Sequence, residues 1–287
     1  MKKIALFANY DKPDAIKWSQ YAAEKLSKLG AECCADISLI EQFDDFTKKV
    51  IEPYKPAEFE KFADIVISFG GDGTMLTAAR SLLNTSIPIM GVNVGKLGFL
   101  AEFSIDHLDE SLQNLMNGNY RVIDRAVFET YLNEENIYGL NDFVVEKRYS
   151  SRIITISIFA NGHHIGDYRA DGVILTTPTG STAYNLSCGG PVIAPTTQVM
   201  CITPISPHMM TLRPLVIPDS NEVQMLIHSP TGEASLVADG QIERIVQTGS
   251  TITINKSESI VKLIKPLDSS YYDLLRNKLL WAANAVK

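Results

Sequence analysis

The residues with the clearest chemical potential form the string Gly-Gly-Asp-Gly-Thr at positions 70–74. The string directly follows an apolar segment and opens a segment with helical spacing. Glycine lets the backbone approach a ligand closely and adopt positive φ, and the start of a helix offers N–H groups and the positive end of a dipole to a phosphate. The carboxylate of Asp72 would repel phosphate unless a metal or a hydroxyl lay between them. Its presence therefore predicts that this loop takes part in a reaction.

The alternative interpretation of residues 70–74 is a tight turn from strand to helix in which Asp72 caps the helix. Such a turn does not need the whole five-residue string. The string also differs from two familiar nucleotide motifs, because a P-loop requires G-x-x-x-x-G-K-[ST] and a dinucleotide fingerprint requires G-x-G-x-x-G. The later segment from Gly91 to Gly98 does not match the P-loop pattern either.

A second polar string, DGVILTTPTGSTAYNLSCGG, occupies residues 171–190. An apolar run typical of a β-strand leads into a loop of small hydroxyl residues and glycines, and a helix is expected after it. The hydroxyl groups of Thr179, Ser181, Thr182 and Ser187 offer hydrogen-bond partners to a purine or a ribose. The alternative is a polar turn followed by a helix N-cap, but the length of the string favours a binding loop.

The composition is that of an ordinary globular protein and narrows the classes of function. The chain has 287 residues, of which 45% are apolar and 21% charged, and its formal net charge is −7. A general nucleic-acid binder is usually basic, because neutralisation of phosphates dominates its affinity. No apolar run approaches the roughly 18 residues of a membrane span. We therefore expect neither a nucleic-acid partner nor a membrane.

Cysteine and histidine usage argues against a dedicated metal site. The four cysteines, at positions 33, 34, 188 and 201, form no C-x-x-C pair, and the five histidines show no zinc-ligand spacing. We interpret the cysteines as reduced thiols of a cytoplasmic protein.

The elements that must position these strings alternate between strand and helix in the first third of the chain. Apolar periodicity predicts strands at 3–8, 33–37, 64–69 and 87–92, and helices at 13–29, 74–83 and 105–116. The charged stretch 41–61, with Pro53 and Pro56, is interpreted as a surface insertion. Strands separated by helices imply parallel βαβ packing.

From about Tyr120 the pattern changes to strand, turn, strand. Strands are predicted at 128–132, 137–145, 153–160, 163–168, 223–228, 234–238, 251–255 and 260–264, and Asn161-Gly162 is a strong signal for a two-residue hairpin. The fold class is therefore an α/β N-terminal domain with a parallel sheet (residues 1–119) and a β-rich C-terminal domain (residues 120–266). A C-terminal helix (residues 267–287) is expected to pack back on the N-terminal domain, because its apolar stripe needs a partner.

The two strings and the Asn-Asp pair at Asn141-Asp142 together resemble the bacterial NAD kinases. The likeness includes the segment Thr-Pro-Thr-Gly-Ser-Thr-Ala-Tyr at 177–184 and runs from Ile4 to about Pro266. The string at 70–74 alone is shared with 6-phosphofructokinases and diacylglycerol kinases, whereas the second string is far more specific. The resemblance implies an NAD kinase-like fold and transfer of a phosphoryl group from ATP to the 2′-hydroxyl of the adenosine ribose of NAD, which gives NADP.

The resemblance also implies roles for individual residues. Asp72 would be the general base in a phosphate-binding loop made of Gly70, Gly71, Gly73 and Thr74, with Gly73 beside the NAD. Asn141 and Asp142 would hold the adenosine ribose and the adenine. Further ligand contacts would come from the residues around the adenine (Phe99, Thr182, Ala183, Tyr184, Asn185, Leu186 and Ser187), from Asp171 at the nicotinamide-side carboxamide, and from Arg152, Arg169 and Gln241.

NAD and ATP are the expected substrates, and Mg²⁺ is expected to enter with ATP rather than on dedicated protein ligands. The family implies a homodimer or a homotetramer.

Two other functions are alternatives to the phosphorylation of NAD. A lipid or sugar kinase could use the same glycine loop, but a lipid kinase should show an apolar or basic membrane face. A regulator that binds NAD(P) without catalysis could do without Asp72, which is present.

Overall fold

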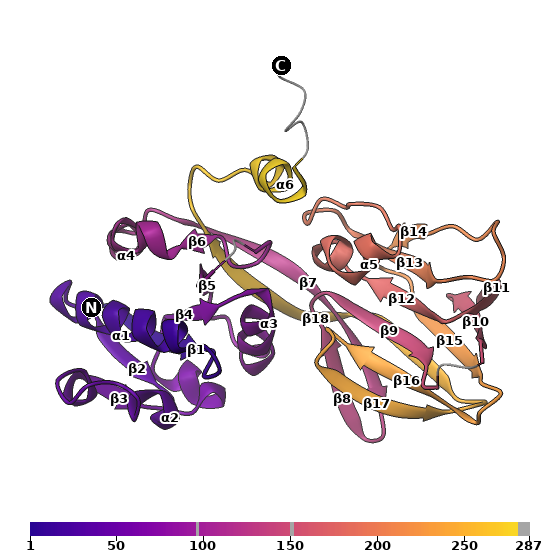
Figure 1. The fold of residues 1–287 in the computed structure, drawn as a ribbon, viewed down its shortest axis with the longest axis horizontal. Coiled ribbons are helices and arrows are strands. Elements are labelled where there is room, and N and C mark those ends of the chain that lie inside the picture. Colours follow the sequence, from indigo (N-terminus) through magenta and orange to yellow (C-terminus); the bar gives the residue numbers. More distant parts are fainter. Residues whose placement is uncertain (96–97, 150–151, 281–287) are drawn as a thin grey trace, which may run out of the picture. The chain divides into compact units, whose positions relative to one another are not determined.

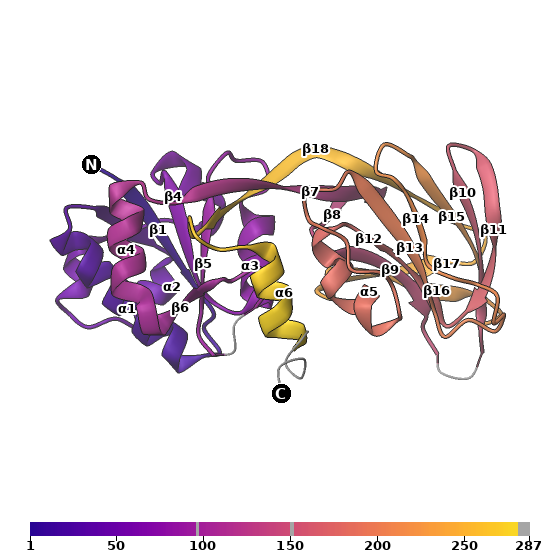
Figure 2. The ribbon, with the colours of Figure 1, turned by 90° about the horizontal axis from the view of Figure 1, so that it is seen from above.

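The computed structural model describes residues 1–95, 98–149 and 152–280, and the chain forms two compact units. Unit 1 is drawn from residues 1–124 and 261–287, and unit 2 from residues 125–260. Two strands contribute residues to both units, β7 (Arg121–Leu132) and β18 (Thr251–Lys265). Figures 1 and 2 follow the chain through the helices and strands of each unit. Among the described residues, no helix is long and apolar enough to cross a membrane.

Unit 1 is built on a parallel sheet with the strand order β5-β4-β1-β2-β3, and the last part of β18 pairs with β5. Every residue of β4 is buried, as expected for a parallel strand covered on both faces. The order reverses between β1 and β4, and such a switch point is where open parallel sheets bind ligands. The strands are β1 (Lys3–Ala8), β2 (Glu32–Ala35), β3 (Ile51–Pro53), β4 (Ile65–Gly70), β5 (Ile89–Asn93) and β6 (Phe103–Ser104), which pairs with β5.

Helices pack on both faces of this sheet (Figures 1 and 2). Buried apolar residues of α1 and α4 share one core with Ile4, Leu6 and Ile67, whereas α3 lies on the opposite face, where Met75 approaches Gly91. The helices are α1 (Pro13–Lys28), α2 (Ile37–Ile40), α3 (Asp72–Ser81), α4 (Leu108–Asn117) and α6 (Tyr271–Leu279), with 3₁₀ turns η1 (Thr47–Val50), η2 (Pro56–Lys61) and η3 (Ile105–His107).

Unit 2 is an antiparallel β-sandwich. One sheet has the order β14-β13-β12-β9-β16-β17, and the other contains β11-β10-β15-β18, with β8 on β7. Apolar residues of the two inner faces form one core, as in Phe143 and Leu175 against Ile156 and Met225. The elements are β8 (Glu135–Gly139), β9 (Asp142–Lys147), β10 (Ile154–Ala160), β11 (His163–Ala170), β12 (Gly172–Thr176), η4 (Thr179–Thr182), α5 (Tyr184–Ser187), β13 (Val199–Ile205), β14 (Leu215–Pro218), β15 (Val223–His228), β16 (Glu233–Ala238) and β17 (Ile242–Gln247).

The predicted fold class, a parallel α/β unit followed by a β-rich unit, is confirmed. The hairpin at Asn161-Gly162 is also confirmed, because both residues have positive φ, 48° and 77°, and Ala160 pairs with His163. The predicted strand 33–37 was too long, since Asp36 accepts a hydrogen bond from the Ser38 N–H and starts α2.

Four other predictions differ from the structure. The stretch 41–61 is not only a surface insertion, because β3 pairs in parallel with β2 and extends the sheet. Residues 251–265 form one strand rather than two. The predicted strand 137–145 is broken into β8 and β9. The last helix begins at Tyr271 rather than at residue 267, and the part predicted at 281–287 lies outside the described residues.

Candidate active site

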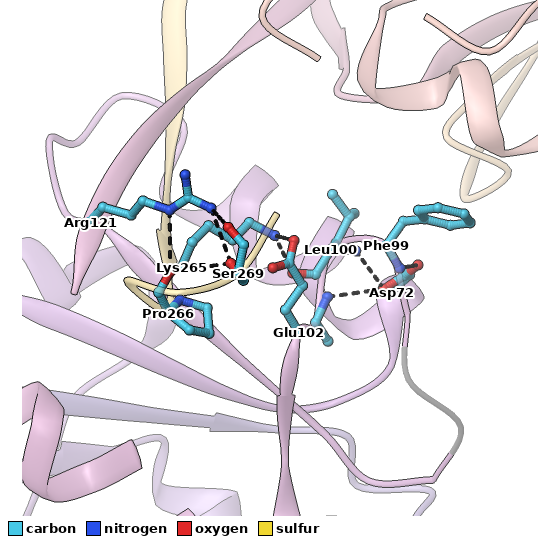
Figure 3. Close-up of polar contacts among 9 residues, drawn as sticks. Asp72, Phe99, Leu100, Glu102, Arg121, Lys265, Pro266 and Ser269 are labelled. Carbon is cyan, nitrogen blue, oxygen red and sulfur yellow. Dashed lines mark hydrogen bonds and ion pairs between the residues drawn. The ribbon is translucent and has the colours of Figure 1, made fainter. Parts of the chain in front are cut away.

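Asp72 is the first residue of α3, directly after the buried strand β4 and the helix N-cap Gly71. Its carboxylate accepts hydrogen bonds from three consecutive backbone N–H groups: Phe99 to Oδ2 at 2.8 Å, and Leu100 and Ala101 to Oδ1 at 3.0 and 3.1 Å (Figure 3). Asp72 therefore holds residues 99–101 against the start of α3. No local pattern predicts this contact, because 27 residues separate Asp72 from Phe99.

This geometry removes the alternative in which Asp72 only caps α3. The side chain of Asp72 reaches another loop, whereas the capping interaction at the helix start comes from Thr74, whose Oγ1 lies 3.4 Å from the Gly71 nitrogen. An ionised carboxylate offers about four acceptor positions. Among the contacts of the described residues, two positions are used on Oδ1 and one on Oδ2. Oδ2 is thus the oxygen that retains acceptor capacity.

The glycines of this loop serve close packing rather than unusual backbone angles. The expectation of positive φ was wrong: Gly71 has a φ of −123° and Gly73 lies within α3. A Cβ on Gly70 would lie 2.1 Å from Oγ1 of Thr74, and a Cβ on Gly98 would lie 1.9 Å from Oδ1 of Asp72. Gly70 therefore lets the helix start close to the strand, and Gly98 lets the 99–101 backbone reach the carboxylate.

In unit 2, Asp239 holds the Asn141-Asp142 pair. Its Oδ1 accepts from the N–H groups of Asn141 at 2.7 Å and Asp142 at 3.2 Å, and its Oδ2 accepts from the Leu140 N–H at 3.1 Å. Asp239 has a φ of 53° in the turn after β16. Sequence reasoning did not select Asp239, although an Asp-Gly turn between two strands is a local signal that such a side chain can bind backbone groups.

The carboxyl group of Asp142 is 4% exposed and lies near the carboxylate of Asp239. Burial, followed by the charge of Asp239, raises the pKa of Asp142 to about 7. Burial likewise raises the pKa of Glu146, with the charges of Glu243 and Asp171 as smaller causes. Strongly shifted groups of this kind concentrate at functional sites.

A cavity of about 280 Å³ opens beside this pair, close to the lower end of the range for small-molecule sites. It brings together four of the predicted residues, Asn141, Asp142, Ala183 and Tyr184. Sequence reasoning missed five other lining residues, namely Val144, Glu146, Val237, Asp239 and Gly240. Carboxylates repel phosphate groups, so this lining suits a neutral base or a ribose better than a phosphate.

The other residues of the 182–187 segment do not line the cavity. Asn185 is fully buried, donates to the carbonyls of Ser181 and Pro191, and accepts from Thr203 Oγ1 at 2.6 Å. Its amide is thus engaged within the protein. Thr182 and Leu186 are half-buried and Ser187 is exposed, and none of the three lines the cavity.

The remaining predicted ligand residues do not line this cavity. Arg152, Arg169 and Gln241 are exposed. Asp171 forms an ion pair of 2.6 Å with Lys147. Phe99 belongs to unit 1, and its ring extends away from the carboxylate that its N–H binds (Figure 3).

No group of three or more His, Cys, Asp or Glu residues is arranged to hold a metal ion within the described parts of the chain. The four cysteines are free thiols.

Comparisons with known proteins show the family of the chain. Residues 4–120 match the ATP-NAD kinase N-terminal domain and residues 140–266 match the ATP-NAD kinase C-terminal domain. An NAD kinase of Bacteroides fragilis is 36% identical over 294 residues, covering 99% of each chain, and one of Prosthecochloris aestuarii is 39% identical over 284 residues, covering 97% of each.

Two solved structures share the fold. An NAD kinase from Archaeoglobus fulgidus in complex with ATP superposes with a TM-score of 0.78 at 25% identity, over 97% of this chain and 98% of that one. Yeast NADH kinase complexed with NADH gives a TM-score of 0.87 at 22% identity, over 100% and 89% of the chains.

Fold and family matches define a phosphotransferase of the kinase class. The chain belongs to the ATP-NAD kinase family, the enzymes that phosphorylate NAD with ATP. The family matches exclude the rival assignment to a lipid or sugar kinase, because they extend through the second string as well as the glycine loop.

Proposed function

We propose that the chain transfers the γ-phosphoryl group of ATP to the 2′-hydroxyl of the adenosine ribose of NAD, with Asp72 as the general base. The observation that carries this proposal is the placement of Asp72, fixed by three backbone N–H groups with acceptor capacity left on Oδ2. A general base must be held within hydrogen-bond reach of the proton that it takes. A hydroxyl that binds Oδ2 therefore meets a carboxylate that is already oriented.

In the proposed reaction the 2′-oxygen attacks the γ-phosphorus while the bond from that phosphorus to the β,γ-bridging oxygen breaks. ADP leaves, and the hydroxyl proton passes to Oδ2 of Asp72. Phosphoryl transfer depends mainly on in-line placement and on neutralising charge. Asp72 contributes to in-line placement by binding the acceptor hydroxyl, and it assists the attack by accepting the proton of that hydroxyl.

The phosphates of ATP are assigned to the loop formed by Gly70, Gly71, Gly73 and Thr74. This loop joins the carboxyl end of β4 to the start of α3, beside the switch point between β1 and β4. The first turn of a helix combines N–H groups with the positive end of the helix dipole, which favours anions.

Mg²⁺ is proposed to arrive bound to ATP. The residues of unit 1 fit this arrangement, since the glycine loop carries a single carboxylate, that of Asp72, and therefore no carboxylate cage. Mg²⁺ usually keeps several waters and binds through one or two carboxylates together with phosphates, whose charge it neutralises.

The cavity of unit 2 is proposed to take the adenine and ribose, through Asn141, Asp142, Ala183 and Tyr184. The pKa of Asp142, raised to about 7, supports this assignment. The neutral carboxyl carries both an O–H donor and an acceptor oxygen, which complement the N7 acceptor and the amino donor of adenine. Further contacts remain predictions for Gly73, Phe99, Arg152, Arg169, Asp171, Thr182, Asn185, Leu186, Ser187 and Gln241.

A homodimer or homotetramer and a cytoplasmic location are also part of this proposal. The free thiols of all four cysteines are consistent with a reducing compartment.

The test uses the purified protein with ATP, Mg²⁺ and NAD. NADP is detected with a dehydrogenase that accepts NADP and not NAD, and phosphorus NMR identifies the phosphorylated hydroxyl. We expect NADP carrying a 2′-phosphate and its loss when EDTA removes the metal. Phosphorylation at the 3′ position, or ATP hydrolysis without a phosphorylated dinucleotide, would contradict the proposal.

A further inference from the structure

Lys265, the last residue of β18, is a buried cation in the core of unit 1. Its side chain is 1% exposed, and its Nζ lies 2.5 Å from Oε1 of Glu102 and 3.1 Å from the carbonyl oxygen of Leu100 (Figure 3). Lysine is rarely buried to this extent, because removing its charge from water is costly unless it is paired. The ion pair with Glu102 accounts for the burial, and the bond to the Leu100 carbonyl needs a separate explanation.

That carbonyl belongs to the same peptide unit as an N–H that binds Asp72. The unit joining Leu100 to Ala101 directs its oxygen to Lys265 at 3.1 Å and its N–H to Oδ1 of Asp72, also at 3.1 Å. A peptide unit is planar and trans, so its oxygen and its N–H point in opposite directions. Lys265 and Asp72 thus hold one rigid plane from its two sides.

Loss of the Lys265 contact would release this plane to rotate. A rotation that turned the Leu100 oxygen towards Asp72 would replace a hydrogen-bond donor by an acceptor and would repel the carboxylate. The adjacent backbone leaves little space for adjustment, because a Cβ on Gly98 would already lie 1.9 Å from Oδ1. The orientation of the Asp72 carboxylate therefore depends on which way the Leu100–Ala101 peptide faces.

We propose that Lys265 is a positioning residue for the phosphoryl transfer, which fixes the Leu100–Ala101 peptide plane and through it the Asp72 carboxylate. This inference rests on the proposed role of Asp72 as the general base. Lys265 contacts Glu102 and the carbonyl oxygen of Leu100, and it acts on Asp72 through the peptide. A positioning role of this kind lowers kcat and leaves KM nearly unchanged, because a displaced base affects the reaction more than the binding of NAD.

A merely structural ion pair makes a different prediction. In that case variants at Lys265 and Glu102 lower the melting temperature alike, and kcat of the folded protein stays close to that of the wild type. The two partners can be separated, because Glu102 contacts Lys265, whereas within the described parts of the chain Lys265 is the residue that donates to the Leu100 oxygen. In Glu102→Gln, Lys265 keeps an N–H donor for Leu100 even if it loses its charge.

The experiment compares Glu102→Gln with Lys265→Met/Glu102→Gln, which removes both charges and keeps a long apolar side chain at position 265. The control is Lys262→Met/Asp124→Asn, which removes the 3.1 Å ion pair between Lys262 on β18 and Asp124. For each protein we would measure kcat, KM for NAD and for ATP, and the melting temperature.

We expect kcat of Lys265→Met/Glu102→Gln to fall roughly 10- to 100-fold below that of Glu102→Gln, with both KM values within about threefold. The control should keep kcat within about twofold of the wild type, as expected for a partly exposed ion pair. The inference is overturned if the folded double variant matches Glu102→Gln in kcat, or if Glu102→Gln alone loses as much kcat as the double variant.

Should the methionine variant not fold, Lys265→Gln/Glu102→Gln replaces it. The two glutamine amides can hydrogen-bond to each other. Glutamine is one bond shorter than lysine, so it withdraws the donor from the Leu100 oxygen. We expect the same fall in kcat, and a wild-type kcat would overturn the inference.

Asp72→Asn separates the role of Lys265 from the role of Asp72 as the general base. If Asp72→Asn retains kcat, the base assignment fails, whereas a loss of kcat in Asp72→Asn with none in the Lys265 variants defeats only the role of Lys265.

Discussion

Two carboxylates, one in each unit, hold a distant loop in the same manner. Asp72 accepts the N–H groups of residues 99–101, and Asp239 accepts those of residues 140–142. In both cases three consecutive amides of another segment converge on one side chain. The surroundings of the two carboxylates differ. Asp72 starts a helix that follows a glycine loop, whereas Asp239 lies in a turn beside the buried carboxyl of Asp142.

One hydrogen-bond arrangement can therefore serve two kinds of chemistry. At Asp72 the amides orient a carboxylate that keeps acceptor capacity on Oδ2, which suits a proton acceptor. At Asp239 the negative charge adds to burial and raises the pKa of its neighbour Asp142 to about 7, so Asp142 retains a proton near neutral pH. Environment, rather than residue type, separates the two roles.

The largest effect on stability is expected from Asp142→Asn. The folded state raises the pKa of Asp142 from 3.8 to about 7, so it binds the proton more tightly than the unfolded state does. The free energy of unfolding therefore falls as pH rises from about 4 through 7, by up to about 4 kcal/mol at roughly 1.36 kcal/mol per pKa unit. Asparagine does not titrate in this range, so Asp142→Asn removes this fall.

Urea unfolding at pH 5 and pH 8 measures the effect. Asp142→Asn should stabilise the protein more at pH 8 than at pH 5, and Asp45→Asn, at an exposed position, should change neither value. An equal change at both pH values would show that the folded protein does not raise the pKa of Asp142.

A smaller effect is expected from Gly180→Ala, which disturbs the loop held by Asp239. A Cβ at this position would lie 2.1 Å from the backbone oxygen of Asn141, so the 140–142 backbone must move. We expect a loss of about 1–3 kcal/mol in the free energy of unfolding, typical of overpacking, and a higher KM for NAD. Gly166→Ala is the matched control, because its Cβ meets only Tyr168 at 3.9 Å. Equal effects of the two substitutions would argue against a rigid loop at Asn141.

Local sequence patterns predicted several helices, strands and turns of both units. Alanine and leucine at helical spacing predicted the helix at 13–29, and the observed α1 buries Ala15, Ala22 and Leu26. The glycine string predicted the strand-to-helix junction, and Asn161-Gly162 predicted its hairpin. These features depend on neighbours in sequence, which is why single-sequence reasoning finds them.

The contacts that were missed join residues far apart in the chain. Asp239 takes the N–H groups at 140–142 from 97 to 99 residues away, and this interrupts the strand predicted at 137–145. Two strands were predicted at 251–255 and 260–264, but Lys256 pairs with Asp219 and Ser257 donates to Glu129 between them, and β18 continues. Asn185 was predicted to contact ligand, yet its amide is used by Ser181, Pro191 and Thr203. No periodicity reveals such pairings.

The smallest effect on stability is expected from Asp171→Asn. Asp171 and Lys147 form an ion pair whose side chains are 35% and 23% exposed, and such pairs contribute up to about 1 kcal/mol. The melting temperature should therefore change little. If Asp171 also contacts the carboxamide of NAD, as the family resemblance implies, KM for NAD should rise several-fold. An unchanged KM would remove Asp171 from the ligand contacts.

The most direct test of the central claim is a side-by-side measurement of kcat and KM for NAD in Asp72→Asn and Asp239→Asn. Each substitution keeps one acceptor oxygen and removes the charge. We expect Asp72→Asn to lower kcat by roughly 10²–10⁴ with KM nearly unchanged, because asparagine cannot take the hydroxyl proton. We expect Asp239→Asn to raise KM for NAD by about tenfold, as for a weakened charge-assisted hydrogen bond, with kcat within about threefold. Near-normal kcat in a folded Asp72→Asn protein that binds NAD would contradict the role of Asp72 as the general base.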